Sequence, residues 1–436
     1  MRKIILGSWI ILGLAMGCSK KSKAKKEMPP PITQEKAAPV DQTAPTGRPI
    51  GKIQVFLETS GSMAGYFQGS GFTGVITKLP IICENIAANK QVGIQFINTP
   101  TDVRPYSGTP AAFANYVNQQ RGKLCTAKSS EIQNIFSYIA DQTSSDAVSL
   151  FVSDCILSFA SRKTDAVDLN TLEANVRGTF QNIQRKGFAV SVYAFTSDFS
   201  GTYYKMDLTK ENYAQVIRPY YVWAIGKKEQ LETFRQKIAG DAGFQPQQQL
   251  HLGFGYAAVT KFEVFSQMIT PRGRFRVRNY QEVYDVDDLP SKPISFYVAC
   301  NLQNLPPYLQ TNLAASSMVV EGNGFKAKVE SIDLQAKLYQ MKLTAEDLER
   351  VGGHTHFVKV KVSDMVPEQG SLRLRLPYRA DEWYKEWSTL DDRTLQANKL
   401  KTFALIHLVK GIQEAYREQQ NFENFIDISV KLTKKD

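Results

Sequence analysis

Short apolar runs alternate with amphipathic stretches through the first half of the chain. The runs have strand length and cover residues 53–57, 92–97, 147–153, 188–195 and 220–226. Each run is continuously hydrophobic, which is typical of strands that are covered on both faces, and the stretches between the runs have helical periodicity. We therefore predict an α/β domain over residues 51–245, with an open, mainly parallel sheet and helices on both faces.

The pattern changes near residue 246. Strands that alternate apolar and polar residues follow at 275–278, 294–302, 325–332, 356–362 and 371–377. This alternation predicts a β-rich, immunoglobulin-like sandwich with one solvated face. An amphipathic helix near 403–416 and a last strand near 425–432 complete this predicted second domain, residues 246–436.

The N-terminus has the pattern of an export signal. A basic pair precedes a mostly apolar run at residues 4–17, which is too short to cross a bilayer but suits a signal peptide. The small residues Ala15 and Gly17, directly before Cys18, resemble the lipobox of bacterial lipoproteins. This resemblance implies that residues 1–17 are removed and that Cys18 is acylated and anchors the chain to a membrane of the cell envelope. Ser19 favours the outer membrane, and the leaflet stays open.

Residues 18–50 are rich in lysine and proline and have almost nothing apolar to bury, so we expect a disordered tether. The tether holds five lysines between residues 19 and 26, and Arg2 and Lys3 leave with the signal peptide. Much of the net charge of +11 therefore lies outside the predicted domains, and nucleic acid is not an expected partner. The remaining cysteines show no framework spacing; Cys155 is interpreted as a buried thiol, and the disulfide state of Cys83, Cys125 and Cys300 stays open.

Polar side chains follow three of the apolar runs. Glu58, Ser60 and Ser62 come directly after the first run, Asp154 follows the run at 147–153, and Asp198 follows the run at 188–195. Ligands of open α/β sheets bind at the carboxyl ends of the strands. We therefore expect these side chains to meet at one edge of the sheet.

The stretch "ETSGSM", residues 58–63, with Asp154 in "VSD", resembles the metal-ion-dependent adhesion site of von Willebrand factor type A domains. That family has DxSxS, so Glu58 stands in place of an aspartate. The resemblance implies that Glu58, Ser60, Ser62 and Asp154 bind Mg²⁺ and that Ser130 takes the place of a threonine ligand, with Ser129 and Thr126 as alternatives. In the family the metal binds a carboxylate of a partner protein, which implies a binding protein rather than an enzyme.

Two features of this predicted site have alternatives. The extra methylene of Glu58 moves its carboxylate by about 1.5 Å, so Mn²⁺ or Ca²⁺ would fit better than Mg²⁺, or the site has lost its metal. Tyr66, Phe67 and Asp198 are expected to form a rim that contacts the partner. The alternative is that the aromatic residues pack on the following helix.

Two other functions compete with metal-dependent protein binding. One is a metal-assisted hydrolase that uses Asp154 or Cys155. All histidines lie outside the first domain, and no P-loop follows Glu58, so a serine nucleophile and a nucleotide site are disfavoured. The other is a structural scaffold with a metal-free site.

Overall fold

The computed structural model describes residues 48–436 except 122, 126–131, 157–165, 208, 266–273, 288, 290–291, 312, 342, 344, 380, 395–397 and 418–422. Several predicted features therefore lie outside the described residues: Cys18, the predicted signal peptide, almost all of the predicted tether, and Ser130 with its alternatives Ser129 and Thr126. Residues 43–436 belong to one compact unit. No helix in the described part of the chain is long and apolar enough to cross a membrane.

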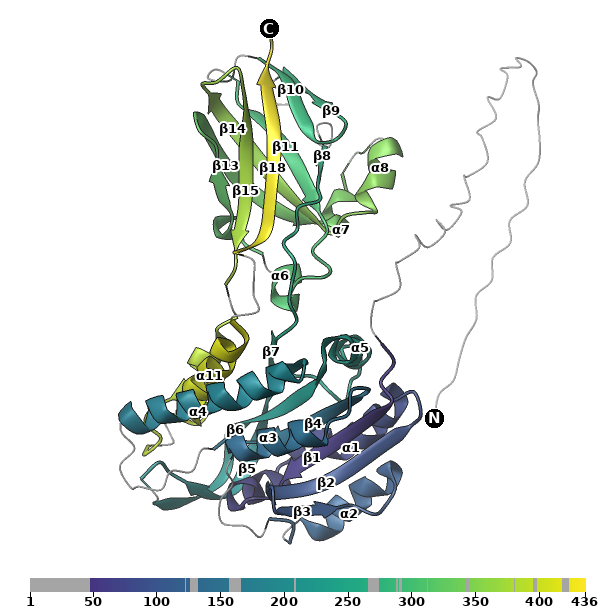
Figure 1. Ribbon diagram of the computed structural model, residues 1–436, viewed down its shortest axis with the longest axis vertical. Coiled ribbons are helices and arrows are strands. Elements are labelled where there is room, and N and C mark those ends of the chain that lie inside the picture. Colours follow the sequence, from purple (N-terminus) through teal and green to yellow (C-terminus); the bar gives the residue numbers. More distant parts are fainter. Residues whose placement is uncertain are drawn as a thin grey trace, which may run out of the picture. The chain divides into compact units, whose positions relative to one another are not determined.

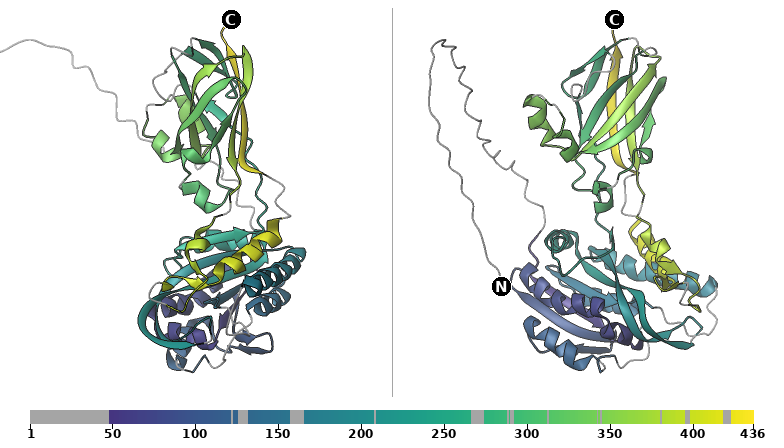
Figure 2. Two further views of the ribbon diagram at one scale, coloured as in Figure 1. Left: turned by 90° about the vertical axis from the view of Figure 1, so that its left-hand side faces the viewer. Right: turned by 180° about the vertical axis from the view of Figure 1, so that it is seen from behind.

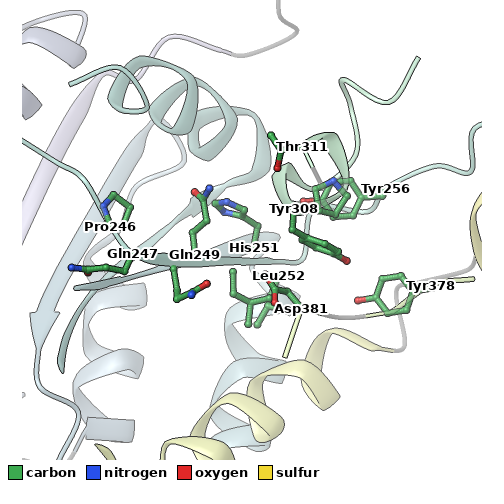
Figure 3. A pocket seen from close by; sticks show the side chains of 13 residues that line it. Pro246, Gln247, Gln249, His251, Leu252, Tyr256, Tyr308, Thr311, Tyr378 and Asp381 are labelled. Atoms are coloured by element: carbon green, nitrogen blue, oxygen red, sulfur yellow. The ribbon is translucent and has the colours of Figure 1, made fainter. Parts of the chain in front are cut away.

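Seven strands form one mixed sheet in the order β3-β2-β1-β4-β6-β5-β7 (Figure 1). The strands are β1 (Lys52–Glu58), β2 (Gln91–Thr99), β3 (Asp102–Pro105), β4 (Ala147–Ser153), β5 (Phe188–Tyr204), β6 (Lys210–Lys227) and β7 (Gln248–Leu252). Strand β7 lies at one edge of the sheet and borders a cavity (Figure 3).

Only the centre of this sheet is parallel. Strand β1 pairs in parallel with β2 and β4, whereas β3, β6, β5 and β7 join by antiparallel pairs. The sheet is therefore mixed, and the expected parallel pairing is confirmed only for β1 with β2 and β4. The cause is the long β5–β6 hairpin, because a strand that follows a tight turn must run back along its neighbour. Strand β6 lies between β4 and β5, so β4 and β5 still run in the same direction and end at the same edge as β1.

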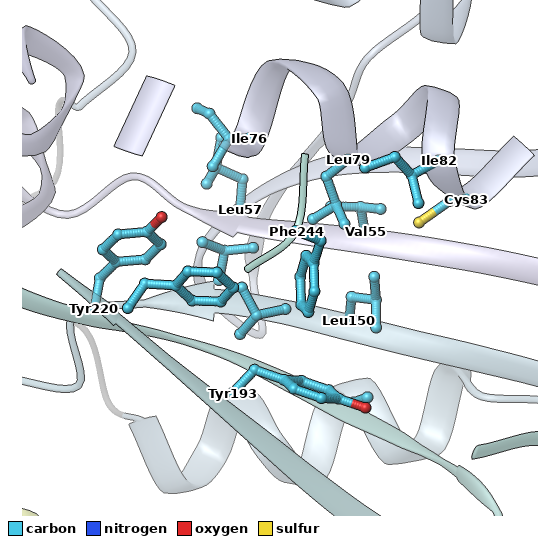
Figure 4. Packing of buried hydrophobic residues seen from close by; sticks show 14 of the residues in the cluster. Val55, Leu57, Ile76, Leu79, Ile82, Cys83, Leu150, Tyr193, Tyr220 and Phe244 are labelled. Carbon is cyan, nitrogen blue, oxygen red and sulfur yellow. The ribbon is translucent and has the colours of Figure 1, made fainter. Parts of the chain in front are cut away.

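Helices cover both faces of the sheet, as expected (Figures 1 and 2). One face carries α1 (Ser70–Ile86), α2 (Phe113–Gln120) and α5 (Lys228–Ile238). The other face carries α3 (Ile132–Gln142), α4 (Ala166–Arg185) and α11 (Leu405–Arg417). Val55 and Leu57 of β1 belong to the first core, where Ile76, Leu79 and Tyr220 surround them (Figure 4), and Phe56 belongs to the second core. Burial on both faces explains why the strand runs are continuously hydrophobic.

Helix α11 packs on α4 and not in the β-rich part of the chain. Leu408 and Ile412 share a core with Val176 and Phe180 of α4. The helices approach so closely that a Cβ atom on Gly411 would lie 2.7 Å from the backbone oxygen of Glu173. The prediction that this helix is part of the β-rich domain is therefore wrong. Its apolar stripe was correctly identified, but the pattern does not say which partner covers the stripe.

Two further sheets share one hydrophobic core. The five-stranded sheet has the order β12-β15-β18-β10-β9, and all its pairs are antiparallel except β10–β18. The four-stranded sheet, β13-β14-β11-β8, is antiparallel. The strands are β8 (Glu263–Phe265), β9 (Arg274–Arg278), β10 (Glu282–Asp287), β11 (Ile294–Cys300), β12 (Val319–Glu321), β13 (Phe325–Leu334), β14 (His356–Met365), β15 (Gln369–Pro377) and β18 (Asn424–Lys434).

Short elements connect these parts. They are α6 (Pro307–Thr311), α7 (Gln335–Leu338), α8 (Ala345–Val351), α9 (Trp383–Glu386) and the small parallel pair β16 (Ser388–Thr389) and β17 (Thr402–Phe403). The chain therefore leaves the seven-stranded sheet after β7, forms most of the β-rich part, returns as α9 to α11, and ends in the β-rich part as β18.

Candidate functional site

Two carboxylates lie at the carboxyl ends of the neighbouring strands β1 and β4. Leu57 pairs with Val152, so Glu58 is the last residue of β1 and Asp154 follows the end of β4. Both side chains are buried, with exposed fractions of 0% for Glu58 and 1% for Asp154. The predicted convergence of these strand ends is therefore present in the structure.

The two serines of the same motif lie together. Ser60 Oγ and Ser62 Oγ are 3.0 Å apart and share a hydrogen bond. Ser60 precedes a short 3-10 helix, Gly61–Gln68, and its extended backbone (φ −68°, ψ 167°) turns the chain into that helix. Because the alternate positions of this turn bring both hydroxyls to one side, the motif presents two neutral oxygens beside the carboxylates.

A strained turn holds Asp154. The Ile156 N–H donates to Asp154 Oδ1 at 3.0 Å, and the Cys155 N–H donates to Ser153 Oγ at 2.8 Å. Cys155 has φ +54°, a left-handed conformation that is costly for a residue with a Cβ atom. Asp154 Oδ2 is buried and has no hydrogen-bond partner among the described residues. A strained backbone conformation at Cys155 therefore accompanies the fixed position of the Asp154 carboxylate. One oxygen of this carboxylate accepts a backbone hydrogen bond, and the other has no partner among the described residues.

The pKa of Asp154 lies well above its ordinary value. Burial is the largest cause, and the nearby Glu58 carboxylate raises the pKa further. The Ile156 N–H, the Ser62 hydroxyl and the Arg218 guanidinium act in the opposite direction without cancelling the rise. The raised pKa of Asp154 means that this carboxylate favours uptake of a proton or of a cation.

The oxygen donors at this edge fit a hard divalent cation. Mg²⁺, Mn²⁺ and Ca²⁺ prefer oxygen ligands, and the edge offers two carboxylates and two hydroxyls, with one carboxylate oxygen of Asp154 unsatisfied. Within the described ranges, no three His, Cys, Asp or Glu side chains are grouped to hold a metal. A cation at this edge would therefore depend on Ser60 and Ser62 as well as on the carboxylates.

No family model, curated protein or solved structure matches this chain.

The predicted rim is wrong for its two aromatic residues. Tyr66 and Phe67 are both 0% exposed. The Tyr66 hydroxyl donates to the backbone oxygen of Pro219 at 2.6 Å, and its ring contacts Phe72 and Phe199 at centroid distances of 5.6 and 5.0 Å. Tyr66 and Phe67 instead pack against the following helix, α1, which was the alternative interpretation. Aromatic residues in a glycine-rich stretch look like an exposed loop in the sequence, but here the 3-10 helix turns them into the core.

Asp198 has a structural partner. Its carboxylate accepts hydrogen bonds from the backbone N–H groups of Ser70 (2.9 Å) and Gly71 (3.1 Å), at the start of α1. Partial burial acts to raise its pKa, but these hydrogen bonds outweigh that effect, and the pKa lies below its ordinary value. Asp198 therefore caps α1 at the same edge of the sheet and is only partly exposed.

The sequence analysis missed a buried arginine near the carboxylates. Arg218 of β6 is 1% exposed, and its Nη1 donates to the backbone oxygens of Asn398 and Lys399 at 3.3 Å and of Lys401 at 2.9 Å. Its guanidinium also lies over the Tyr203 ring, 4.5 Å from the centroid. A single arginine before an apolar run looks like a surface residue in the sequence, so no local signal marks it.

A third buried carboxylate, Asp392, completes this cluster. It accepts hydrogen bonds from the Tyr203 hydroxyl (2.8 Å) and from the Met206 N–H (2.9 Å). Asp392 and the carbonyls that Arg218 contacts belong to the segment between α9 and α11. A segment from the C-terminal part of the chain therefore contacts β5 and β6 near the predicted site.

Cys83, Cys125, Cys155 and Cys300 are free thiols. The interpretation of Cys155 as a buried thiol is confirmed, and its Sγ accepts a hydrogen bond from Trp223 Nε1 at 3.2 Å. Burial raises the pKa of the Cys155 thiol, which keeps it protonated. A protonated, buried thiol is a poor nucleophile, and this weakens the hydrolase alternative for Cys155.

Proposed function

We propose that this protein binds another protein through a divalent cation held by Glu58, Ser60, Ser62 and Asp154. The supporting observation is the buried pair of Glu58 and Asp154 at the ends of neighbouring parallel strands, with Asp154 Oδ2 unsatisfied among the described residues. Mg²⁺, or Mn²⁺ or Ca²⁺, would offer a coordination position to a carboxylate of the partner. Ser130 is proposed as a further ligand.

The residues of the chain have separate tasks in this proposal. Glu58 and Asp154 supply the negative charge, and Ser60 and Ser62 supply hydroxyl oxygens that their mutual hydrogen bond holds on one side of the turn. Arg218 partly offsets the negative charge of the two carboxylates, since its guanidinium lowers the pKa of Asp154. None of these roles requires bond cleavage, and the proposal is therefore binding and not catalysis.

The proposed setting is the bacterial cell envelope. Acylation of Cys18 would anchor the chain, in the outer membrane by the identity of Ser19, and residues 18–50 would link the anchor to the compact unit. The proposed fold relationship is a von Willebrand factor type A domain followed by an immunoglobulin-like sandwich. The order of strands β1, β2 and β4 and the motif at residues 58–63 support the first assignment.

Calorimetry tests directly whether the site binds a divalent cation. MgCl₂ and MnCl₂ are titrated into residues 43–436 at pH 7.5, beside Ser60→Ala and Ser70→Ala. Ser70 is an exposed serine at the start of α1 and serves as the matched control. We expect saturable heat in the parent and in Ser70→Ala and its loss in Ser60→Ala. If the parent shows no saturable heat with either metal, the proposed cation site does not exist.

A second experiment tests the partner. The same three proteins are used to capture proteins from envelope extracts with MgCl₂ or with EDTA. We expect partners that bind the parent and Ser70→Ala only with Mg²⁺ and that do not bind Ser60→Ala. Capture that is equal in EDTA would contradict cation-dependent binding.

A structural role is the second candidate, and one observation favours it. Glu58 and Asp154 are at most 1% exposed, so a partner carboxylate can reach a cation there only if the surrounding segments open. A site that stays closed would instead hold a proton between the carboxylates and serve the fold. Loss of stability in Ser60→Ala without metal-dependent heat in the parent would select this candidate.

A further inference from the structure

A cavity of about 360 Å³ lies along β7, away from the carboxylate pair. Its walls include Gln249 and His251 of β7, the tyrosines Tyr256, Tyr308 and Tyr378, and Asp381 (Figure 3). Small-molecule sites in proteins have volumes of roughly 300 to 1,000 Å³, so this cavity suits a small ligand.

Three tyrosine rings form a fixed aromatic wall. Each contacts the buried Phe425, with ring centroids 6.2 Å from Tyr256, 6.5 Å from Tyr308 and 5.0 Å from Tyr378. The Tyr308 hydroxyl donates to the backbone oxygen of Arg379 at 2.5 Å, which restrains this ring further. The wall therefore offers rigid apolar ring faces next to polar groups.

His251 supplies a buried polar atom that is not satisfied. Its Nδ1 lies 2.8 Å from Ser191 Oγ, whereas Nε2 is buried and has no hydrogen-bond partner in the described part of the chain. The side chain is 91% buried, since its exposed fraction is 9%. Figure 3 shows the side chains of Gln249 and His251 on the same side of β7. Buried polar groups normally have a partner, so Nε2 is left with a hydrogen-bonding capacity that no described residue uses.

The charges of the walls limit the class of ligand. Burial, and then the charge of Arg235, lower the pKa of His251 to about 3, so its imidazole is neutral at pH 7. Among the described residues that line the cavity, Asp381 is the one carboxylate and no lysine or arginine is present. An anionic ligand would therefore meet no counter-charge. Amide, imidazole, hydroxyl and carboxylate groups together offer both donors and acceptors to hydroxyl groups.

From this combination we propose that the cavity binds a neutral sugar, with a pyranose ring against the tyrosine wall and its hydroxyls on Gln249, His251 and Asp381. A pyranose has an apolar C–H face and a rim of hydroxyls, which matches one apolar and one polar wall. This site is independent of the proposed cation site and uses none of its residues.

An extended peptide is the competing ligand, because β7 is an edge strand and could add a further strand. One of the edge groups is already used, since Trp383 Nε1 donates to the backbone oxygen of Gln249 at 3.1 Å. Strand β7 has five residues, so little unpaired edge is left for a peptide. The side chains of the cavity thus favour the sugar.

Saturation-transfer NMR tests the proposal. Residues 43–436 are mixed in EDTA with millimolar glucose, N-acetylglucosamine or cellobiose, and separately with glucose 6-phosphate and an extended Thr-Val repeat peptide. Gln249→Ala and Tyr308→Leu remove one polar and one aromatic contact. Gln245→Ala is the matched control, because Gln245 is an exposed glutamine outside the cavity lining.

We expect transfer to the ring protons of at least one neutral sugar, with a Kd about tenfold higher in Gln249→Ala and in Tyr308→Leu and unchanged in Gln245→Ala. EDTA keeps the result independent of the cation proposal. If Tyr308→Leu fails to fold, the Kd of Gln249→Ala alone still tests the sugar-binding proposal. Absence of transfer to all three sugars, equal transfer in Gln249→Ala, or transfer only to the phosphate or to the peptide would overturn the proposal.

Discussion

Glu58 and Asp154 lie side by side at the ends of two neighbouring parallel strands, and both carboxylates are buried. Two like charges with little water between them repel each other strongly. The structure relieves this repulsion in part through the Ile156 N–H, the Ser62 hydroxyl and Arg218. A divalent cation would relieve it much further.

Replacing Glu58 by aspartate should strengthen cation binding. The change shortens the side chain by one methylene, about 1.5 Å, and gives the carboxylate of the adhesion-site motif. We expect Glu58→Asp to lower the Kd for Mg²⁺ about tenfold in calorimetry. Glu229→Asp, an exposed glutamate at the start of α5, should change nothing. Weaker Mg²⁺ binding in Glu58→Asp would show that the longer side chain is itself required.

Arg218 should be important for stability. Removal of a buried charge from a hydrogen-bonded cluster leaves unpaired partners and costs about 3 to 5 kcal/mol. We expect Arg218→Met to lower the free energy of unfolding in urea by this amount, since the carbonyls of Asn398, Lys399 and Lys401 lose their donor and Asp392 loses a nearby cation.

Arg373→Met is the control for that variant. Arg373 pairs with Asp427 at 2.5 Å, but Arg373 is exposed, and exposed ion pairs contribute little to stability. Similar losses in Arg218→Met and Arg373→Met would contradict the structural role of Arg218.

Protonation of His251 should destabilise the protein as the pH falls below 6.5, whereas the raised pKa of Asp154 acts in the opposite direction over the same range. The pKa of His251 is about 3 in the folded protein, lowered by burial and by Arg235, and about 6.5 in an unfolded chain. Between these two values the unfolded chain binds more protons, so the free energy of unfolding falls as the pH falls, by up to about 1.4 kcal/mol per pH unit for this group.

Thermal unfolding from pH 7.5 to pH 4.5 measures this effect. His354 and His356 also have pKa values lowered by burial, and Asp154 has a raised one, so the pH dependence of the parent is a sum of opposing contributions. Relative to the parent, His251→Gln should therefore become more stable as the pH falls. A pH dependence in His251→Gln that equals the parent's would exclude a contribution from His251.

Two glycines on the paired helices α4 and α11 should respond in opposite ways to alanine. A Cβ atom on Gly411 would lie 2.7 Å from the Glu173 backbone oxygen, so Gly411→Ala should force α11 away from α4 and lower stability by about 1 to 3 kcal/mol. A Cβ atom on Gly178 of α4 would meet nothing within 4 Å. Gly178→Ala should therefore raise stability by about 0.5 to 1 kcal/mol, because alanine favours the helix. Equal effects in urea denaturation would show that the close packing of the helices is unimportant.

The sequence contains the information for the strands and for the convergence of Glu58, the serines and Asp154. Continuous apolar runs reveal strands that are buried on both faces, and polar residues at strand ends reveal the edge of the sheet at which the carboxylates meet. The direction of β6 was not predictable in the same way, because a buried antiparallel strand has the same continuous apolar pattern as a parallel one.

Contacts between residues that are far apart in the chain explain why the environments of Tyr66, Arg218 and α11 were not predicted. Tyr66 was expected at the surface because its neighbours are glycines, but its hydroxyl partner, Pro219, lies 153 residues away. Arg218 and Asp392 are likewise far apart in the chain and have no motif around them. Helix α11 shows an apolar stripe, and only the tertiary structure shows that α4 covers it.

The packing of α11 on α4 has a consequence for biosynthesis. Translation produces all of the seven-stranded sheet and then more than a hundred residues of the β-rich part before the helix that covers Val176 and Phe180 appears. The nascent chain must therefore carry an apolar patch on α4 until ribosomes have almost finished the protein. Early termination at residue 404 would leave this patch without its cover, and we expect such a product to be aggregation-prone and dependent on chaperones.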